Sequence, residues 1–297
     1  MSEMHRPKMH ADEVMIEDAV VRRLLSSQFP QWADQPLERL PDSGTDSAIY
    51  RLGDDHGVRL PRIHWAVRQI DRENEWLKRL APELPVAIPV PVARGDPSED
   101  YPYPWLIYPW LKGTSLDQLE QPATPDLVRQ IAELVLALER VSAEGGPEPG
   151  NRGRAMADRD KATRVGIERL GDAIDAERAL SVWNQALDAG PWEGESVWVH
   201  GDLLPANIIV DSGRLTGAID WSGLGVGDPA CDGMLAWALA HDTRAVFRQT
   251  LGFDDATWAR SRGWVVEQTV HYIPYYEHTL PEAVEDARKR LTAALEG

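Results

Sequence analysis

The sequence has one cysteine in 297 residues, Cys231. A single cysteine excludes an intramolecular disulfide bond and a metal site built from several thiolates. No apolar run approaches the roughly 18 residues that a membrane-spanning helix requires. Residues 1–12 carry charges and lack the apolar segment of a signal peptide. These absences predict a cytoplasmic protein in a reducing compartment, with no membrane partner.

Positive charge is also scarce. The chain has 31 Lys and Arg residues against 48 Asp and Glu residues, a formal net charge of −17. No basic patch is visible, so nucleic acid is not expected as a partner. An acidic protein attracts a cationic small molecule electrostatically, although acidity is also common for the sake of solubility alone. The length suits two lobes or one large α/β domain with a substantial core.

Three oxygen-bearing side chains occur at suggestive intervals in the second half of the sequence. Asp202 lies three residues after a short apolar run at 196–199, Asn207 opens another run at 207–210, and Asp220 follows a third at 215–219. A turn at 211–213 makes the last two runs a predicted hairpin. The three side chains are therefore expected to converge. Single Asp and Asn residues in loops are often turn or capping residues, but this complete pattern is typical of phosphoryl transfer.

That chemistry assigns each residue type a task. A carboxylate orients a hydroxyl nucleophile, and an amide oxygen with a second carboxylate holds Mg²⁺ on the nucleotide phosphates. Mg²⁺ prefers few hard oxygen donors and retains several waters.

The motifs resemble those of the aminoglycoside phosphotransferase family, whose fold is similar to that of protein kinases. They are His200-Gly201-Asp202 with Asn207, Ile219-Asp220-Trp221, and Gly227-Asp228-Pro229-Ala230. The resemblance implies an O-phosphotransferase that uses ATP or GTP and Mg²⁺. By the family's motif, Asp202 is the catalytic base, Asn207 and Asp220 are the metal ligands, and His200 and Asp228 are structural supports. No Asp-Phe-Gly or Ala-Pro-Glu follows Asp220, which disfavours a protein kinase.

The same resemblance implies an α+β fold of two lobes. Residues 1–108 would form a nucleotide-binding lobe with an antiparallel sheet, one main helix and a leading helix. Residues 109–113 would form the hinge, and residues 114–297 a mainly helical lobe with the catalytic loop and the acceptor site.

Candidate nucleotide contacts occur along the first lobe. Residues 40–52 read as strand, turn and strand, and backbone N–H groups in the turn could close over phosphates, which makes Ser43, Thr45 and Ser47 candidates. The turn has a single glycine and no Walker pattern. A third strand at 58–62 carries Arg59 where the family usually has Lys. The predicted helix at 65–80 carries Glu73, which is the expected ion-pair partner of Arg59.

The predicted strand at 105–108 leads into the hinge. By resemblance, backbone groups near Tyr108 and Trp110 bind the purine. For their side chains, packing in an aromatic core is the better interpretation.

The second lobe reads as mainly helical, from 125 to 144, from 158 to 189, and after Asp228, with breaks near Pro274 and Pro281. The loop at 145–154 contains four glycines and two prolines and is the candidate for a mobile segment at the mouth of a cleft. Acceptor contacts are expected from Asp232, Tyr275 and Tyr276.

Several alternatives stay open. An antibiotic is the favoured acceptor, either an aminoglycoside or a nucleoside type such as a capuramycin-like compound, and its phosphorylation would confer resistance. A metabolic acceptor similar to choline or homoserine is the alternative. A catalytically inactive kinase-like binding protein is a third interpretation, favoured by the missing Lys and opposed by the presence of Asp202, Asn207 and Asp220. The protein is expected as a monomer or a homodimer.

Overall fold

The computed structural model describes residues 12–40 and 46–297. Ser43 and Thr45, two of the predicted nucleotide contacts, lie outside the described residues. The chain divides into two compact units, which are described separately. Unit 1 comprises Met1–Ala81 and Ile88–Leu111, and unit 2 comprises Pro82–Ala87 and Lys112–Gly297.

Unit 1 is built on an antiparallel sheet of five strands in the order β1-β2-β3-β5-β4. Polar turns separate apolar strand segments, and β2 pairs with β3 in a register that places Ile49 opposite Arg59. The strands are β1 (Leu37–Arg39), β2 (Ser47–Leu52), β3 (His56–Pro61), β4 (Ala93–Gly95) and β5 (Trp105–Pro109).

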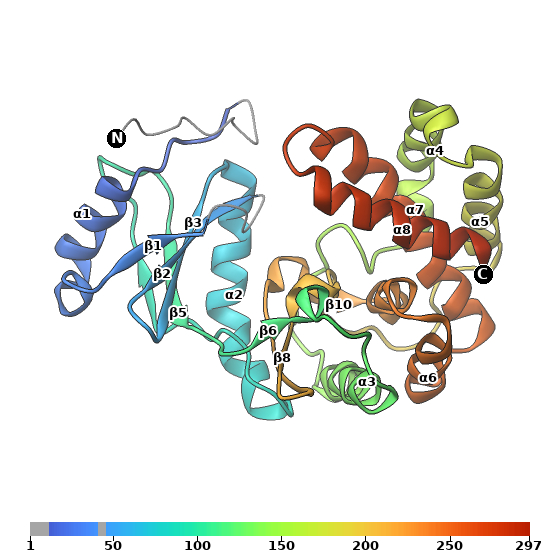
Figure 1. Ribbon diagram of the computed structural model, residues 1–297, viewed down its shortest axis with the longest axis horizontal. Helices are drawn as coiled ribbons and strands as arrows, with labels where there is room; N and C mark the ends of the chain where they lie inside the picture. Colours follow the sequence, from blue (N-terminus) through green and yellow to red (C-terminus); the bar gives the residue numbers. More distant parts are fainter. Residues whose placement is uncertain (1–11, 41–45) are drawn as a thin grey trace. The chain divides into compact units, whose positions relative to one another are not determined.

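Two helices cover opposite faces of this sheet, as Figure 1 shows: α1 (Asp18–Gln28) and α2 (Val67–Leu80). Side chains alternate along a strand. Tyr50 and Leu60 therefore point into the core that α1 closes. Ser47 and Arg59 point to the other face, where Arg59 meets Glu73 of α2. The leading helix and the main helix expected for the first lobe are both present.

Unit 2 is mainly helical, and α7 is its central element. α4, α5 and α8 pack against α7, most of which is buried between Thr257 and Ile273. The helices are α3 (Pro125–Arg140), α4 (Asp160–Leu170), α5 (Ala176–Asp188), α6 (His241–Leu251), α7 (Asp255–Tyr276) and α8 (Pro281–Glu296), with a 3₁₀ helix over Pro229–Ala238. Among the described residues, none of the helices combines the length and apolarity needed to cross a membrane.

One predicted helix break was wrong. The helix α7 continues through Pro274 to Tyr276. A proline removes one backbone hydrogen bond, but this one lies in the last turn, after the buried stretch has ended at Ile273. Packing of that stretch holds the helix up to the proline. The predicted helix over 158–189 is in fact two helices, α4 and α5.

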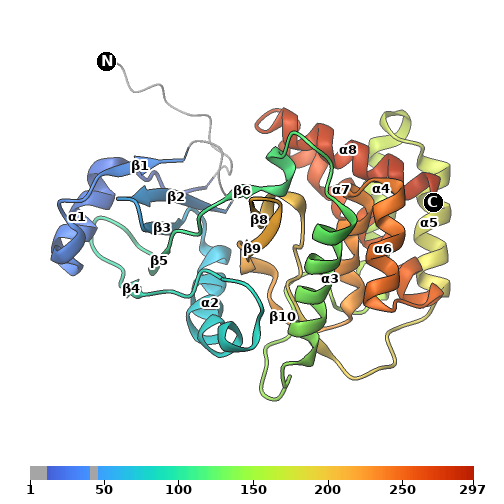
Figure 2. The same cartoon turned by 60° about the horizontal axis from the view of Figure 1, so that its bottom comes forward.

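Short strands in unit 2 place the candidate catalytic residues. β6 (Thr114–Ser115), β8 (Ile208–Asp211) and β9 (Arg214–Ala218) form one sheet, and β7 (Val197–Val199) pairs with β10 (Gly225–Gly227). The β8–β9 hairpin turns at Ser212 and Gly213, both with positive φ. Figure 2 shows this hairpin beside α3, where Gln130 Oε1 accepts a hydrogen bond from Leu215 N.

The N-terminal cap of α3 can be tested by mutation. Thr124 Oγ1 accepts a hydrogen bond from Leu127 N at 3.2 Å, and Pro125 occupies the first helical position. Thr124→Ala removes this cap and is expected to lower the free energy of unfolding by about 1 kcal/mol. Thr124→Ser keeps a hydroxyl group and is the control, so its free energy of unfolding should fall much less. Equal stability of the Ala and Ser variants in urea titrations would show that the cap contributes nothing.

Candidate active site

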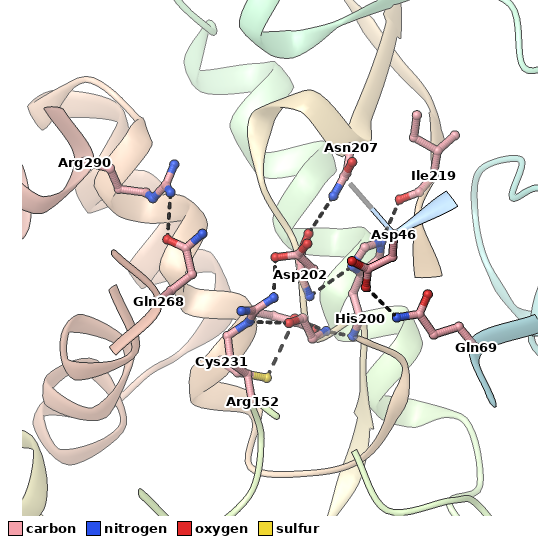
Figure 3. Close-up of polar contacts among 12 residues, drawn as sticks. Asp46, Gln69, Arg152, His200, Asp202, Asn207, Ile219, Cys231, Gln268 and Arg290 are labelled. Atoms are coloured by element: carbon pink, nitrogen blue, oxygen red, sulfur yellow. Dashed lines mark hydrogen bonds and ion pairs between the residues drawn. The ribbon is translucent and has the colours of Figure 1, made fainter. Parts of the chain in front are cut away.

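The loop between β7 and β8 carries Asp202 and is braced by the ring of His200. Nδ1 of His200 accepts a hydrogen bond from Asp202 N at 3.3 Å, and Nε2 donates to the carbonyl oxygen of Ile219 at 3.0 Å. The ring also packs against Trp221, with centroids 4.5 Å apart. One buried imidazole thus ties the backbone of Asp202 to the residue that precedes Asp220, which fits the structural role expected for His200 (Figure 3).

The start of the loop is anchored by Asp232. Its two carboxylate oxygens accept hydrogen bonds from His200 N and Gly201 N, each at 2.8 Å. The residue is only 1% exposed, and burial raises the pKa of its carboxyl group. Asp232 was expected among the acceptor contacts. The structure instead places it beneath the catalytic loop, because the 3₁₀ helix after Asp228 turns it inward.

Gly201 makes the tight geometry feasible. Its φ is +76°, and a Cβ atom there would lie 2.3 Å from the carbonyl oxygen of Gly223. A side chain at residue 201 would therefore be strained in its backbone and would collide with a second backbone segment. The glycine of the His-Gly-Asp motif is required by this close approach.

Asn207 and Asp220 are brought together by the hairpin. The backbone carbonyl of Asn207 accepts a hydrogen bond from Ile219 N at 2.9 Å. Nδ2 of Asn207 donates to the carbonyl oxygen of Asp202 at 2.9 Å, so the side-chain oxygen of Asn207 is the atom left for a metal. Asp220 has a φ of 57° and a ψ of 69°, a left-handed conformation that is costly for a residue other than glycine. Such conformations concentrate at functional sites.

The donor set fits Mg²⁺ held together with a nucleotide. In residues 12–40 and 46–297, no group of three or more His, Cys, Asp or Glu side chains is arranged to hold a metal ion. Asn207 and Asp220 offer one amide and one carboxylate. Mg²⁺ commonly binds through one or two carboxylates and completes its shell with substrate phosphates and water.

Arg152 was not predicted. Its Nη2 donates to Oδ1 of Asp202 at 2.5 Å, and its Nε donates to the carbonyl oxygen of Gly201 at 2.7 Å (Figure 3). The surrounding loop, the candidate for a mobile segment, is hydrogen-bonded at two points. Val226 N in β10 donates to Pro147 O, and Asp228 N, just after β10, donates to Gly153 O. In the sequence, nothing distinguished Arg152 from Arg154 in this glycine-rich loop or signalled the contact with Asp202.

Asp228 has the supporting role that the resemblance implies. Oδ1 of Asp228 accepts a hydrogen bond from Ala230 N at 2.9 Å, and Oδ2 accepts one from Arg260 Nε at 2.7 Å. The pair is buried. Asp228 therefore begins the 3₁₀ helix that carries Asp232.

Within unit 1, the predicted contact between Arg59 and Glu73 is confirmed. The guanidinium of Arg59 donates from Nη1 to Glu73 Oε1 at 2.5 Å, from Nε to Ser47 Oγ at 3.2 Å and from Nη2 to Gln69 Oε1 at 3.0 Å. All of its nitrogens are oriented by neighbouring side chains. The Oγ of Ser47 positions Arg59.

The two residues predicted near the hinge lie at the end of β5. The ring of Tyr108 covers Gly57, where a Cβ atom would lie 2.6 Å from the ring. The backbone N of Trp110 donates to Asp55 O at 2.8 Å, and Arg51 lies over the indole at 5.4 Å. The Trp110 N–H is thus already used within unit 1. The side chains of Tyr108 and Trp110 are half-buried and do not lie in an aromatic core as expected, because β5 reaches the edge of the unit here.

Tyr275 and Tyr276, the other predicted acceptor contacts, lie in the last turn of α7. Their rings are 4.7 Å apart, and the ring of Tyr276 is 4.6 Å from that of Tyr272. Tyr275 is 49% exposed. Burial raises the pKa of the Tyr272 hydroxyl, and the carboxylate of Asp202 acts in the same direction.

The sequence matches the model of a family described as "Phosphotransferase enzyme family" over residues 38–264. Three curated proteins are similar. "Uncharacterized protein YcbJ" of Bacillus subtilis is 28% identical, over 79% of this chain and 81% of that protein. "Viomycin phosphotransferase" of Streptomyces vinaceus is 29% identical, over 61% and 66%. "Aminoglycoside 3'-phosphotransferase" of Streptomyces fradiae is 32% identical, over 54% and 60%.

Solved structures share the fold. A GDP complex of an aminoglycoside 2'-phosphotransferase aligns with a TM-score of 0.74 at 18% identity, over 95% of this chain and 99% of that one. A macrolide 2'-phosphotransferase of Brachybacterium faecium aligns with a TM-score of 0.64 at 25% identity, over 92% and 97%. The expected kinase-like α+β fold is thereby confirmed.

The acids beneath the catalytic loop predict a pH-dependent stability. Burial, together with the nearby Asp232, raises the pKa of Glu139 on α3 to about 7. The unfolded chain should titrate this group near pH 4.3. Because the folded protein binds the proton more tightly, this group's stabilising contribution is complete at low pH and is lost as the pH rises from about 4.3 to about 7.

Glu139→Gln removes this loss. Relative to the native protein, its free energy of unfolding should rise by about 2 kcal/mol between pH 5 and pH 8 in urea titrations. Glu133→Gln, an exposed change on the same helix, is the control. A pH dependence shared by both variants would contradict the assignment.

Proposed function

Because the chain belongs to the phosphotransferase enzyme family, we propose that it transfers the γ-phosphoryl group of ATP or GTP to a hydroxyl group of a small molecule. The observation that carries this proposal is the joint placement of Asp202, Asn207 and Asp220 by one loop and one hairpin. Phosphoryl transfer depends mainly on positioning and charge neutralisation. A rigid arrangement of few oxygen atoms suits it.

Each residue has a task in this reaction. The side-chain oxygen of Asn207 and the carboxylate of Asp220 would hold Mg²⁺, which would neutralise charge on the phosphates. Asp202 orients the acceptor hydroxyl and accepts its proton. Since Oδ1 of Asp202 is engaged by Arg152, Oδ2 is the atom that receives the hydroxyl. In unit 1, Arg59 contacts the nucleotide phosphates, held ready by Glu73.

The similar proteins support an antibiotic as the acceptor. Their names specify viomycin, aminoglycosides and macrolides as substrates, and solved structures of the same fold hold GDP or ADP. Modification of such a compound in the cytoplasm, where ATP and GTP are available, would confer resistance.

The first test is the proposed base. Asp202→Asn keeps the size of the side chain but removes its capacity to accept a proton, so kcat should fall by about 10²–10⁴-fold. Mg·ATP affinity measured by calorimetry should change little. Product is detected by mass spectrometry as a phosphate gain on antibiotics screened with ATP and GTP. Near-native turnover would refute the role of Asp202.

The second test is the metal ligand. Asp220→Asn should weaken Mg·ATP binding by about tenfold or more, about 1.4 kcal/mol, because a charged oxygen donor is lost. The matched control is Asp211→Asn, which removes an exposed carboxylate from the same hairpin. Calorimetry with and without Mg²⁺ separates the metal effect. Equal Mg·ATP affinity in the two variants would exclude Asp220 as a ligand.

A further inference from the structure

The loop at 145–154 holds an arginine against the proposed catalytic base. Nη2 of Arg152 donates to Oδ1 of Asp202 at 2.5 Å, and Nε of the same guanidinium donates to the carbonyl oxygen of Gly201 at 2.7 Å. Only 18% of the Arg152 side chain and 23% of the Asp202 side chain are exposed. One guanidinium therefore fixes the backbone just before Asp202 and the carboxylate of Asp202 at the same time (Figure 3).

The backbone on both sides of Arg152 lies directly on β10. A Cβ atom at Gly225 would lie 2.2 Å from Cα of Pro149, and a Cβ atom at Gly227 would lie 2.2 Å from the carbonyl oxygen of Gly153. Side chains at these two positions of β10 would push the loop away, so the glycines permit the close approach. The loop is thus held by backbone contacts three residues before Arg152 and one residue after it.

The segment that follows the loop is anchored separately. Arg159, at the end of the 3₁₀ helix Met156–Arg159, donates to Oε1 of Glu267 from Nε at 2.8 Å and from Nη2 at 2.6 Å. Glu267 belongs to the buried part of α7 and is only 2% exposed. None of these anchors involves Asp202. The position of Arg152 is therefore set by the rest of unit 2, and Arg152 can in turn set the position of Asp202.

The carboxylate of Asp202 needs such a contact. His200 and Asn207 contact its backbone N and O atoms, and these contacts leave the side chain free to turn. The last torsion of an Asp side chain is broad and prefers no single angle strongly. Among the described residues, Arg152 is the one whose side chain donates to this carboxylate. With Oδ1 held by Arg152, Oδ2 keeps one direction.

On the premise of the phosphotransfer reaction proposed above, we propose that Arg152 is a positioning residue that holds the carboxylate of Asp202 with Oδ2 directed at the acceptor hydroxyl. In phosphoryl transfer the main task of such a carboxylate is to orient the nucleophile. The planar guanidinium suits this role, because two of its nitrogens reach Gly201 and Asp202 together. The ammonium of Lys is a point charge and cannot reproduce both contacts in the same geometry.

Turnover tests the role of Arg152. Viomycin, kanamycin and erythromycin are offered with Mg·ATP and Mg·GTP, and release of inorganic phosphate measures transfer to water where no compound reacts. Arg152→Gln should lower kcat by about 10²-fold, because the rate falls steeply when a reacting group is misplaced. The KM for the nucleotide should stay within about twofold, because Arg152 has no part in holding the nucleotide.

Arg154→Gln is the matched control. Arg154 lies in the same loop and donates from Nε to the carbonyl oxygens of Pro149 and Gly150, and 46% of its side chain is exposed. This variant also removes a charge and two hydrogen bonds from the loop, but it leaves the contact with Asp202 intact. Its kcat should stay within about twofold of the native value. An equal kcat in the Arg152 and Arg154 variants would overturn the inference.

Arg152→Lys separates orientation from charge. It keeps the positive charge beside Asp202 but loses the joint contact with Gly201, so kcat should still fall by about tenfold or more. A native kcat in Arg152→Lys would show that charge alone suffices, and Arg152 would not be a positioning residue.

A double variant shows whether Arg152 acts through Asp202. In the Asp202→Asn background, Arg152→Gln should change kcat by no more than about twofold, because no base remains to be positioned. A further loss as large as that of Arg152→Gln in the native background would mean that Arg152 acts independently of Asp202, which contradicts the proposal.

Thermal unfolding examines the same pair without turnover. The Tm is measured for the native protein, for Asp202→Asn, for Arg152→Gln and for the double variant. If the two side chains hold each other, the double variant should lose less Tm than the sum of the two single losses. Strictly additive losses would refute the coupling. Transfer of phosphate neither to a compound nor to water would refute the proposed reaction, while the four Tm values still decide whether Arg152 holds Asp202.

Discussion

The carboxylate of Asp232 is the contact on which the candidate site depends. It is enclosed and accepts two backbone hydrogen bonds at the start of the catalytic loop. Charge-assisted bonds of this kind offset the cost of burying an ionised group. Once His200 is fixed in this way, its ring holds the backbone at Asp202 and at Ile219. The positions of Asp202 and Asp220 therefore depend on one acid that is itself buried beneath the loop.

In unit 1, the position of Arg59 is likewise fixed by several hydrogen bonds. Its guanidinium reaches Ser47, Gln69 and Glu73 with three different nitrogens. The ammonium of Lys is a point charge and does not span three partners placed around a plane. The departure from the usual Lys is therefore matched by neighbours that suit Arg. Those neighbours argue against reading the substitution as a sign of lost activity.

The parts that the sequence predicted are those set by local rules. The spacing of apolar runs around 207–219 predicted the β8–β9 hairpin, and helical periodicity predicted the helix that carries Glu73. Arg152 was missed because its partner Asp202 lies 50 residues away. Asp232 was assigned to the acceptor because proximity in sequence to Asp228 does not reveal which way a 3₁₀ helix turns a side chain. Long-range packing decides both cases.

The same limit applies to the acceptor. The net charge alone favours a cationic compound, but a net charge is a sum over the whole chain and does not describe the site. Recognition depends on the few charges that remain buried near the reacting group, where screening is weak. Arg290 shows why buried charges escape sequence analysis, since it and Gln268 come from two helices at the end of the chain and meet only through the packing of α7 against α8. A residue of this kind has no motif, so its burial and its contact with Gln268 could be known only once these helices were placed.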